Sequence, residues 1–158
     1  MSKIIKRLPN LKYLLVGEGD DMPRVKKLVK EFSVSEYVVF TGFISDAELP
    51  YYYNLCDVFV MPSKREGFGI VFLEALAYGK PVIAGNKGGS PDALLDGKLG
   101  ILVDPDNVDQ IANAIVDVLE KKVSAHLLDK DYLRKAVLEN FGFKNFSNKL
   151  KEIVDGKN

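Results

Sequence analysis

Residues 58–74 read Val-Phe-Val-Met-Pro-Ser-Lys-Arg-Glu-Gly-Phe-Gly-Ile-Val-Phe-Leu-Glu. They open with a β-branched apolar run, Val58–Met61, which is typical of a strand with both faces buried. A loop with Gly67 and Gly69 follows, and the pattern after it is that of an apolar helix. A strand that passes through a short loop into a helix is the repeating unit of a parallel α/β sheet.

The rest of the chain repeats this unit. Further strands of the same kind are predicted at Tyr13–Val16, Val38–Phe40, Pro81–Ala84 and Ile101–Val103. Amphipathic helical stretches separate them, which makes each connection a crossover between parallel strands. The predicted fold class is therefore α/β, a Rossmann-like doubly wound parallel sheet in three α/β/α layers. A length of 158 residues fits a single domain over residues 1–158.

Two helix starts carry capping signals. Ser45 with Glu48 three residues later forms a capping box, and Pro50 then lies inside the helix, where it should remove one hydrogen bond. Asn107 and Gln110 form a similar cap farther along the chain. We therefore expect one helix to begin near Ser45 and another directly after Asn107.

The two ends of the chain differ from a complete doubly wound domain. The helical stretch Ile4–Leu8 has no strand before it, so we expect the first strand of the domain to lie upstream. The basic helical stretch Asp131–Val154 has no strand after it, and we expect it to pack against something that this chain does not contain. Both features favour one part of a longer protein.

Composition narrows the classes of function. The 22 Lys and Arg balance the 22 Asp and Glu, so no global field attracts nucleic acid, and no nucleic-acid partner is expected. A single cysteine, Cys56, excludes an internal disulfide and a cysteine-based zinc cluster, and we expect it to be buried near a helix end. The single histidine, His126, excludes a histidine triad, and we expect it at the surface. The absence of a long apolar run favours a cytoplasmic protein and leaves a peripheral contact with the inner face of the membrane open.

The glycine loop after Met61 is the candidate site. Ligands of open parallel sheets bind at the carboxyl ends of the strands, which is where this loop begins. Gly67 and Gly69 remove side chains where a ligand would approach the backbone, and the free amides of the following helix suit a pyrophosphate. Glu66 and Glu74 flank the turn, roughly 12 Å apart if most of the interval is helical. A carboxylate there can accept hydrogen bonds from two hydroxyls of a ribose or a sugar.

The ordered motifs of this region resemble those of a known family. Glu66-Gly-Phe-Gly-Ile-Val-Phe-Leu-Glu74 looks like the Glu-x7-Glu signature of the group 1 glycosyltransferases, which are retaining enzymes built from two Rossmann-like domains. Matching motifs are Leu15-Val-Gly-Glu-Gly-Asp20, Val39-Phe-Thr-Gly-Phe-Ile44, Asp57-Val-Phe-Val-Met-Pro-Ser63, Lys87-Gly-Gly-Ser-Pro-Asp92 and Gly100-Ile-Leu-Val-Asp-Pro-Asp106. The resemblance spans roughly Leu11 to Leu119 and implies the C-terminal, donor-binding half of a two-domain glycosyltransferase.

The resemblance also implies roles for single residues. Glu66 is the catalytic candidate, because it would contact the donor sugar and support the reacting centre. Glu74 would hold the ribose hydroxyls, the amides from Gly67 to Ile70 would cradle the distal phosphate, and the Gly42–Ile44 turn would lie against the base. The substrate-binding residues implied in this way are Glu74, Gly67, Phe68, Gly69, Ile70, Gly17, Gly19, Gly42, Phe43, Ile44, Lys64 and Arg65. The family uses no obligatory metal, so no metal site and no cofactor are expected, and the nucleotide sugar is a substrate.

The chain departs from the family pattern in several places. The arginine and lysine that clamp the diphosphate follow the first strand of this domain in the family, upstream of the present chain. Lys64 and Arg65 are the candidates to substitute for them in part. Asp92 stands where many relatives have glutamate. The N-terminal acceptor-binding domain is missing from this chain, and we expect the isolated chain to be inactive.

Other functions stay open at this point. The chain fits a non-catalytic nucleotide-sugar-binding module, and also part of a nucleotide-sugar epimerase or phosphorylase with the same two-domain plan. A dinucleotide-binding site is disfavoured, because Gly17-Glu-Gly19 is followed by Met22 where that fingerprint needs a third glycine. Asp104-Pro-Asp106 resembles a metal-binding acid pair, but its place between a strand and a helix cap predicts a turn.

Overall fold

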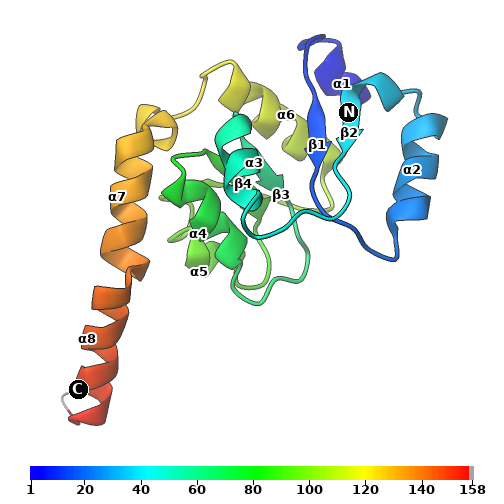
Figure 1. Ribbon diagram of the computed structural model, residues 1–158. Helices are drawn as coiled ribbons and strands as arrows, with labels where there is room; N and C mark the ends of the chain where they lie inside the picture. Colours follow the sequence, from blue (N-terminus) through cyan, green and yellow to red (C-terminus); the bar gives the residue numbers. More distant parts are fainter. Residues whose placement is uncertain (157–158) are drawn as a thin grey trace. The chain divides into compact units, whose positions relative to one another are not determined.

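The computed structural model describes residues 1–156, which divide into one compact unit that ends at Cys56 and another that begins at Asp57. The first unit contains α1 (Ser2–Ile5), β1 (Tyr13–Leu15), α2 (Met22–Glu31), the 3-10 helix η1 (Ser35–Tyr37), β2 (Val38–Phe40) and α3 (Leu49–Leu55) (Figure 1). The second contains β3 (Phe59–Met61), α4 (Ile70–Ala77), β4 (Val82–Gly85), α5 (Ser90–Ala93), β5 (Ile101–Val103), α6 (Val108–Leu119), the 3-10 helix η2 (Ala125–Leu128), α7 (Lys130–Phe141) and α8 (Phe143–Val154). Every predicted strand is present, and its ends lie within one residue of the prediction.

The first unit has a parallel two-stranded sheet. β1 pairs with β2 so that Tyr13 lies beside Val38 and Leu15 beside Phe40, and α2 makes the crossover between them. Tyr13 is 37% exposed and Val39 is 44% exposed. The prediction that all strands are buried on both faces is therefore wrong for this unit, because a sheet of two strands has few neighbours to cover it.

The start of α3 differs from the predicted one. The Glu48 carboxylate accepts the Ser45 amide at 2.9 Å, as in a capping box, but the Ser45 hydroxyl also donates to this carboxylate, at 2.6 Å. The helix itself begins only at Leu49, so Pro50 lies in its first turn. The amides of the first turn of a helix have no acceptor within the helix, so a proline at this position removes no hydrogen bond. The predicted loss of a hydrogen bond at Pro50 is therefore wrong. Cys56 ends the helix and is half-buried rather than buried.

The second unit has a parallel sheet in the order β3-β4-β5. Phe59 pairs with Val82, and Ile83 with Ile101, so the carboxyl ends of the three strands lie at one edge. Every residue of β4, the central strand, is buried. The prediction of strands buried on both faces is confirmed for β4, because it has a strand on each side and helices on each face.

The side chains of successive β3 residues show which helix covers which face of the sheet. Val60 packs with a cluster that includes Val103 of β5 and Val118 of α6. The neighbouring Phe59 instead meets Phe72 of α4 edge to face, with ring centroids 6.2 Å apart. Because successive side chains of a strand point to opposite faces, α6 and α4 cover opposite sides of the sheet. Parallel strands with flanking helices confirm the predicted Rossmann-like α/β class, whereas one domain over residues 1–158 without its first strand stays a prediction.

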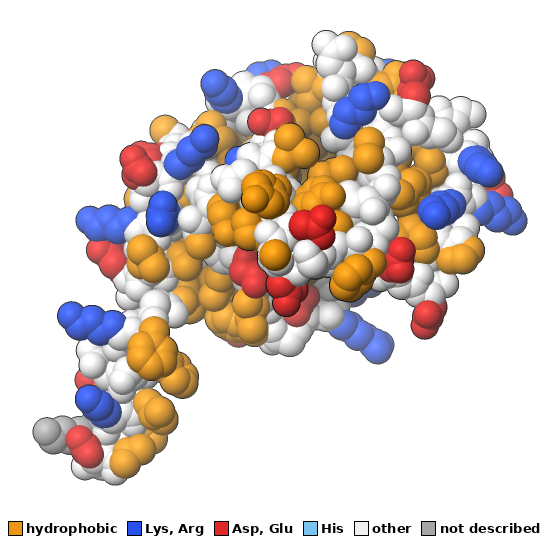
Figure 2. Space-filling model, in the orientation of Figure 1, with side chains coloured by type: hydrophobic (Ala, Val, Ile, Leu, Met, Phe, Trp, Pro, Cys, Tyr) orange, Lys and Arg blue, Asp and Glu red, His pale blue; other side chains and the backbone are white. Residues whose placement is uncertain are grey.

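The predicted C-terminal helical stretch consists of two helices. Gly142 is extended, with φ −63° and ψ 150°, and separates α7 from α8. α7 packs against α4 and buries Leu133 completely, so the expectation that this stretch packs against something outside the chain is wrong for α7. No residue described in α8 is buried, and its hydrophobic side chains lie along one side of the helix while charged ones lie along another (Figure 2).

Candidate functional site

The glycine loop between β3 and α4 has a backbone that only glycine suits. Gly69 precedes α4 with φ +91°, in the left-handed region. A Cβ atom at this position would lie 2.3 Å from Cδ2 of Phe72. Gly69 also has no side chain with which to cap the helix. Its carbonyl oxygen accepts the Phe72 amide at 2.9 Å, so the amides left without a cap are those of Ile70 and Val71. Such amides suit an anion, and binding of a phosphate here stays a prediction.

Glu66 lies directly before this turn and is half-buried. Its Oε1 accepts the amide of Gly67 at 3.0 Å. One of the amides predicted to cradle a phosphate is therefore occupied by the preceding carboxylate. Glu74 is half-buried one turn inside α4, which begins only at Ile70. Four of the seven residues between the two carboxylates, 70–73, are therefore helical, and the separation of roughly 12 Å stays a prediction.

The structure brings several of the predicted residues to one pocket. An open pocket of about 400 Å³ is lined by Met61, Glu66, Phe68, Gly69, Ile70 and Val71. Glu74, Lys64, Arg65 and Gly67 belong to the same unit but do not line it. The pocket combines one carboxylate with apolar walls and with the start of a helix, which suits a ligand that carries both hydroxyls and a negative charge.

Phe68 makes a contact that the sequence did not predict. Its ring lies edge to face against Phe141 at the end of α7, with centroids 5.8 Å apart. Phe68 is still 38% exposed, so one part of the ring packs and another borders the pocket. No local signal links Phe141 to the glycine loop, because the contact depends on how α7 packs across α4.

Lys64 is engaged in an ion pair with Asp106, in the turn after β5. Lys87, in the loop after β4, binds the same carboxylate at 3.0 Å and that of Asp104 at 3.3 Å. The predicted turn at Asp104–Asp106 is confirmed, since the Asp106 amide donates to Oδ1 of Asp104 at 3.0 Å. Arg65 is exposed. A role for Lys64 and Arg65 in binding phosphate stays a prediction.

The first unit brings two of the other predicted glycines together. The Gly17 amide donates to the carbonyl oxygen of Gly42 at 3.1 Å and lies 3.3 Å from the Thr41 hydroxyl oxygen. Both glycines have positive φ, 106° and 69°, which explains why they are glycines. Next to this turn Phe43 is 78% exposed. Ile44 is half-buried and Gly19 is exposed.

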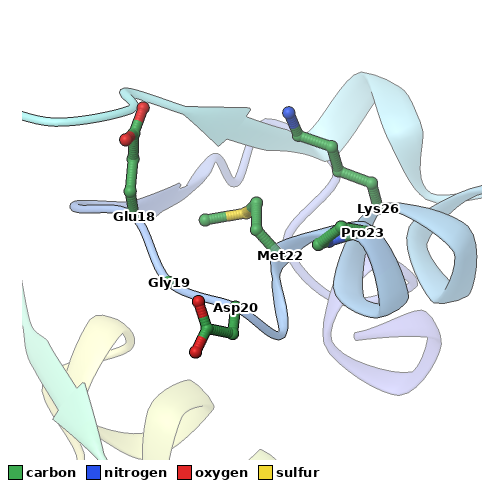
Figure 3. Close-up of a pocket in the computed structure, with 6 residues that line it drawn as sticks. All are labelled: Glu18, Gly19, Asp20, Met22, Pro23 and Lys26. Atoms are coloured by element: carbon green, nitrogen blue, oxygen red, sulfur yellow. The ribbon is translucent and has the colours of Figure 1, made fainter.

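A second open pocket, of about 690 Å³, lies in the first unit and is shown in Figure 3. Its lining residues are Glu18, Gly19, Asp20, Met22, Pro23 and Lys26. The first three come from the loop after β1, and the others come from the first turns of α2. Gly19 is the one predicted site residue among them. The mixture of one ammonium with two carboxylates gives this pocket no clear preference for an anion or a cation.

The described residues hold neither a candidate metal site nor a candidate membrane-spanning helix. Among residues 1–156 no three His, Cys, Asp or Glu side chains gather in a group able to hold a metal ion. His126 is exposed, as predicted, and its ring lies 5.3 Å from that of Tyr132. Within this described part of the chain, no helix has the length and apolar character needed to cross a membrane.

The sequence matches one family model and relatives that are named as mannosyltransferases. A family model described as Glycosyl transferases group 1 matches residues 1–135. The chain is 35% identical, over 99% of its length, to a protein of Mycolicibacterium smegmatis named GDP-mannose-dependent alpha-(1-6)-phosphatidylinositol monomannoside mannosyltransferase. It is 40% identical, over 75% of its length, to a protein of the same name from Mycobacterium tuberculosis.

Solved structures share the fold. Sucrose-phosphate synthase of Thermosynechococcus elongatus matches 98% of the chain with a TM-score of 0.82 and 29% identity. An Anabaena protein, HepE, solved in complex with UDP, matches 99% of the chain with a TM-score of 0.79 and 24% identity, which shows the fold alone. The chain spans 43% and 33% of the two mannosyltransferases and 40% and 45% of the two solved chains, which is less than half of each.

Proposed function

The chain belongs to the group 1 glycosyl transferases, and from this premise we propose that it is the donor-binding part of a retaining enzyme that uses a nucleotide sugar. The observation that carries the proposal is the start of α4. Gly69 leaves the first amides of that helix without a side-chain cap, and the Glu66 carboxylate lines the same pocket. An anion site beside a hydroxyl acceptor is the combination that a sugar diphosphate requires.

The amides at the start of α4 are proposed to bind the distal phosphate of the donor. The helix dipole favours a negative charge at this end. Amides held by the backbone need no reorganisation while charge builds up on the departing diphosphate, so they lower the barrier to its departure. This role leaves no obligatory task for a metal ion, and we propose that none is required.

Glu66 and Glu74 are proposed to have different tasks. Glu66 lines the pocket, so we assign it to the donor sugar and the reacting centre. Its carboxylate also accepts the Gly67 amide. A phosphate that takes this amide would release the carboxylate, which could then accept hydroxyls of the sugar. Glu74 lies one turn farther along α4, and we assign it to the ribose hydroxyls.

Transfer to an acceptor is proposed to need more than this chain. The chain spans less than half of the mannosyltransferases that it resembles. We therefore assign the acceptor site to an N-terminal domain outside the chain, and we expect the isolated chain to bind donor without transferring it. The two mycobacterial relatives are named as GDP-mannose-dependent, so GDP and GDP-mannose are the first ligands to test.

Calorimetric titration with GDP, UDP and ADP, and then with their sugar conjugates, tests the proposal. Glu74→Ala should weaken binding of the nucleoside diphosphate by roughly 1–3 kcal/mol, the usual scale for losing hydrogen bonds to a charged group. Glu66→Ala should weaken binding of the sugar conjugate more than that of the bare nucleotide. Glu152→Ala, an exposed glutamate of α8, is the control and should change neither.

Three results would contradict the proposal. Absence of binding by the wild-type chain would remove the donor site itself. An unchanged affinity of Glu74→Ala for the nucleotide would remove the ribose assignment. Equal losses for the two kinds of ligand in Glu66→Ala would show that Glu66 does not distinguish the sugar.

A further inference from the structure

The glycine loop between β3 and α4, residues 62–69, is called the donor loop below. A second loop, residues 85–89, which starts at the last residue of β4, lies against its backbone. Gly89 shows this most clearly, because its φ of −84° is a conformation that any residue adopts. A Cβ atom on Gly89 would nevertheless lie 2.1 Å from the carbonyl oxygen of Gly67 and 2.8 Å from Cα of Phe68. The space for a side chain at Gly89 is therefore filled by the donor loop, and the reason for glycine here is close approach rather than backbone freedom.

Two further glycines of this loop make contacts of the same kind. A Cβ atom on Gly85 would lie 2.1 Å from the carbonyl oxygen of Ser63, and one on Gly88 would lie 2.6 Å from that of Glu66. All of these neighbours are backbone atoms, which cannot swing aside as the end of a flexible side chain can. The Gly89 amide also donates to the Glu66 carbonyl oxygen at 2.9 Å. The two loops therefore touch at successive points from Ser63 to Phe68.

We propose that Gly89, together with Gly85 and Gly88, is a positioning residue for the donor site. By contact with the backbone of Glu66 and Gly67, the loop of residues 85–89 holds the Glu66 carboxylate and the first amides of α4 in the arrangement that a donor needs. This inference rests on the proposed function, since it concerns the same site. None of the three glycines lines the pocket, so their action on the ligand is indirect.

The ion pairs at Asp106 support the same conclusion. Lys64 belongs to the donor loop and Lys87 to the loop of residues 85–89, and both bind the Asp106 carboxylate. The two loops are thus joined a second time, through side chains, to the turn after β5. This second link is exposed and weaker than the backbone contact, because water and salt screen charges at a surface.

Alanine at position 89 tests the proposal. To reach even a tight contact of 3.0 Å its Cβ must move the Gly67 oxygen by about 1 Å, and a displacement of that size at a reacting group can reduce activity by about 100-fold. We expect Gly89→Ala to weaken binding of a nucleoside-diphosphate sugar by about 10- to 100-fold, and to weaken binding of the bare nucleotide less. The reason is that Glu66, which lies at the point of contact, is assigned to the sugar, whereas Glu74 is assigned to the ribose.

Gly97→Ala is the matched control. Gly97 is in the same unit and has φ +87°, but the nearest atom to an added Cβ is 3.7 Å away. This substitution therefore strains the backbone without touching the donor loop. It should lower the melting temperature while the affinities for sugar conjugate and bare nucleotide stay in the wild-type ratio. A merely structural role of Gly89 would give the same pattern in Gly89→Ala, and would overturn the proposal.

A measurement without ligand separates this inference from the proposed function. In amide NMR spectra of the ligand-free chain, Gly89→Ala should shift the signals of residues 66–69 and speed their hydrogen exchange, whereas Gly97→Ala should not. If Gly89→Ala does not fold, Asp106→Asn takes its place, because this exposed substitution removes the carboxylate that Lys64 and Lys87 share and should speed exchange at the same amides. Unchanged amides would overturn the inference whether or not the wild-type chain binds a donor, and failure of donor binding alone would overturn the proposed function.

Discussion

Asp106, in the turn after β5, binds one lysine from each of two other loops of the second unit. Hydrogen bonds from Lys64, and next from Lys87, hold the pKa of the Asp106 carboxyl below its ordinary value. The neighbouring Asp104 also has a lowered pKa, chiefly because it accepts the Asp106 amide and then because of Lys87. The pKa of Lys87 is raised, first by Asp106 and then by Asp104. All these groups are at the surface, so their contribution to stability should be modest.

The direction of the shifts predicts a pH dependence. A lowered aspartate pKa stabilises the fold above the ordinary value of about 4, and the effect is lost as the pH falls through the lower folded value. The raised pKa of Lys87 stabilises the fold below about pH 10, and the effect is lost as the pH rises through the raised value. We expect Asp106→Asn to lower the melting temperature at pH 7, and the difference from wild type to vanish at pH values well below 4.

Thermal melts from about pH 2.5 to pH 8 at low salt would measure this difference. Asp46→Asn, at another exposed aspartate, serves as the control and should follow wild type throughout. Addition of about 1 M salt should shrink the Asp106→Asn effect at pH 7, because the Debye length falls to about 3 Å. A difference that persists unchanged at low pH would contradict the assignment to ion pairs.

At the scale of elements, local signals predicted helix starts well where the cap is a single side chain. Asn107 is the predicted cap of α6, and its Oδ1 accepts the Gln110 amide at 3.0 Å. The prediction at α3 was less accurate, because the carboxylate of Glu48 binds Ser45 while the helix starts later, at Leu49. A sequence shows which residues are able to cap, but the exact start depends on which hydrogen bonds the folded chain makes.

Removal of the cap of α6 should destabilise the protein by a predictable amount. Asn107→Ala leaves the Gln110 amide without its acceptor, and the expected loss is about 1 kcal/mol in the free energy of unfolding. Urea unfolding followed by circular dichroism would measure it. Asn107→Asp keeps an acceptor at the same position and should stay within about 0.5 kcal/mol of wild type. Equal losses for the two variants would show that the cap is not the cause.

The two C-terminal helices should differ in their contribution to stability. Leu133 of α7 is 0% exposed, whereas Leu150 of α8 is 49% exposed. The same truncation at the two positions therefore compares burial with little change in chemistry. Leu133→Ala should lower the free energy of unfolding by about 2–5 kcal/mol, the range for a buried leucine. Leu150→Ala should lower it by less than about 1 kcal/mol, and similar losses in urea unfolding would show that α8 is covered in solution.

At the scale of the whole molecule, balanced charge determines solution behaviour. The chain carries 22 basic and 22 acidic residues, and its isoelectric point is near 6.6. Molecules without net charge repel each other least, so we expect solubility to be lowest near that pH. Precipitation with polyethylene glycol over a range of pH would locate the minimum. The double variant Lys149→Glu, Lys151→Glu should move it to a lower pH, and an unmoved minimum would show that net charge is not the cause.

The predicted site residues are distributed over both units of the molecule. Gly17, Gly19 and the Gly42–Ile44 turn belong to the first unit, and the Glu66–Ile70 loop with Glu74 belongs to the second. Within each unit the structure brings the expected neighbours together, since Gly17 meets Gly42 and Glu66 meets the start of α4. Their roles toward a ligand stay predictions until binding is measured.

The amino-acid sequence by itself determined the strands, the cap of α6, the glycine loop and the family. These features depend on periodicity, on hydrogen bonds between near neighbours in the chain, and on motifs that can be read in order. Only the tertiary structure decided that Gly89 lies against Gly67, that Phe68 meets Phe141, and that Asp106 joins two lysines. Each of these contacts joins residues from different loops or helices, and their meeting depends on how the helices pack on the sheet, which no local pattern records.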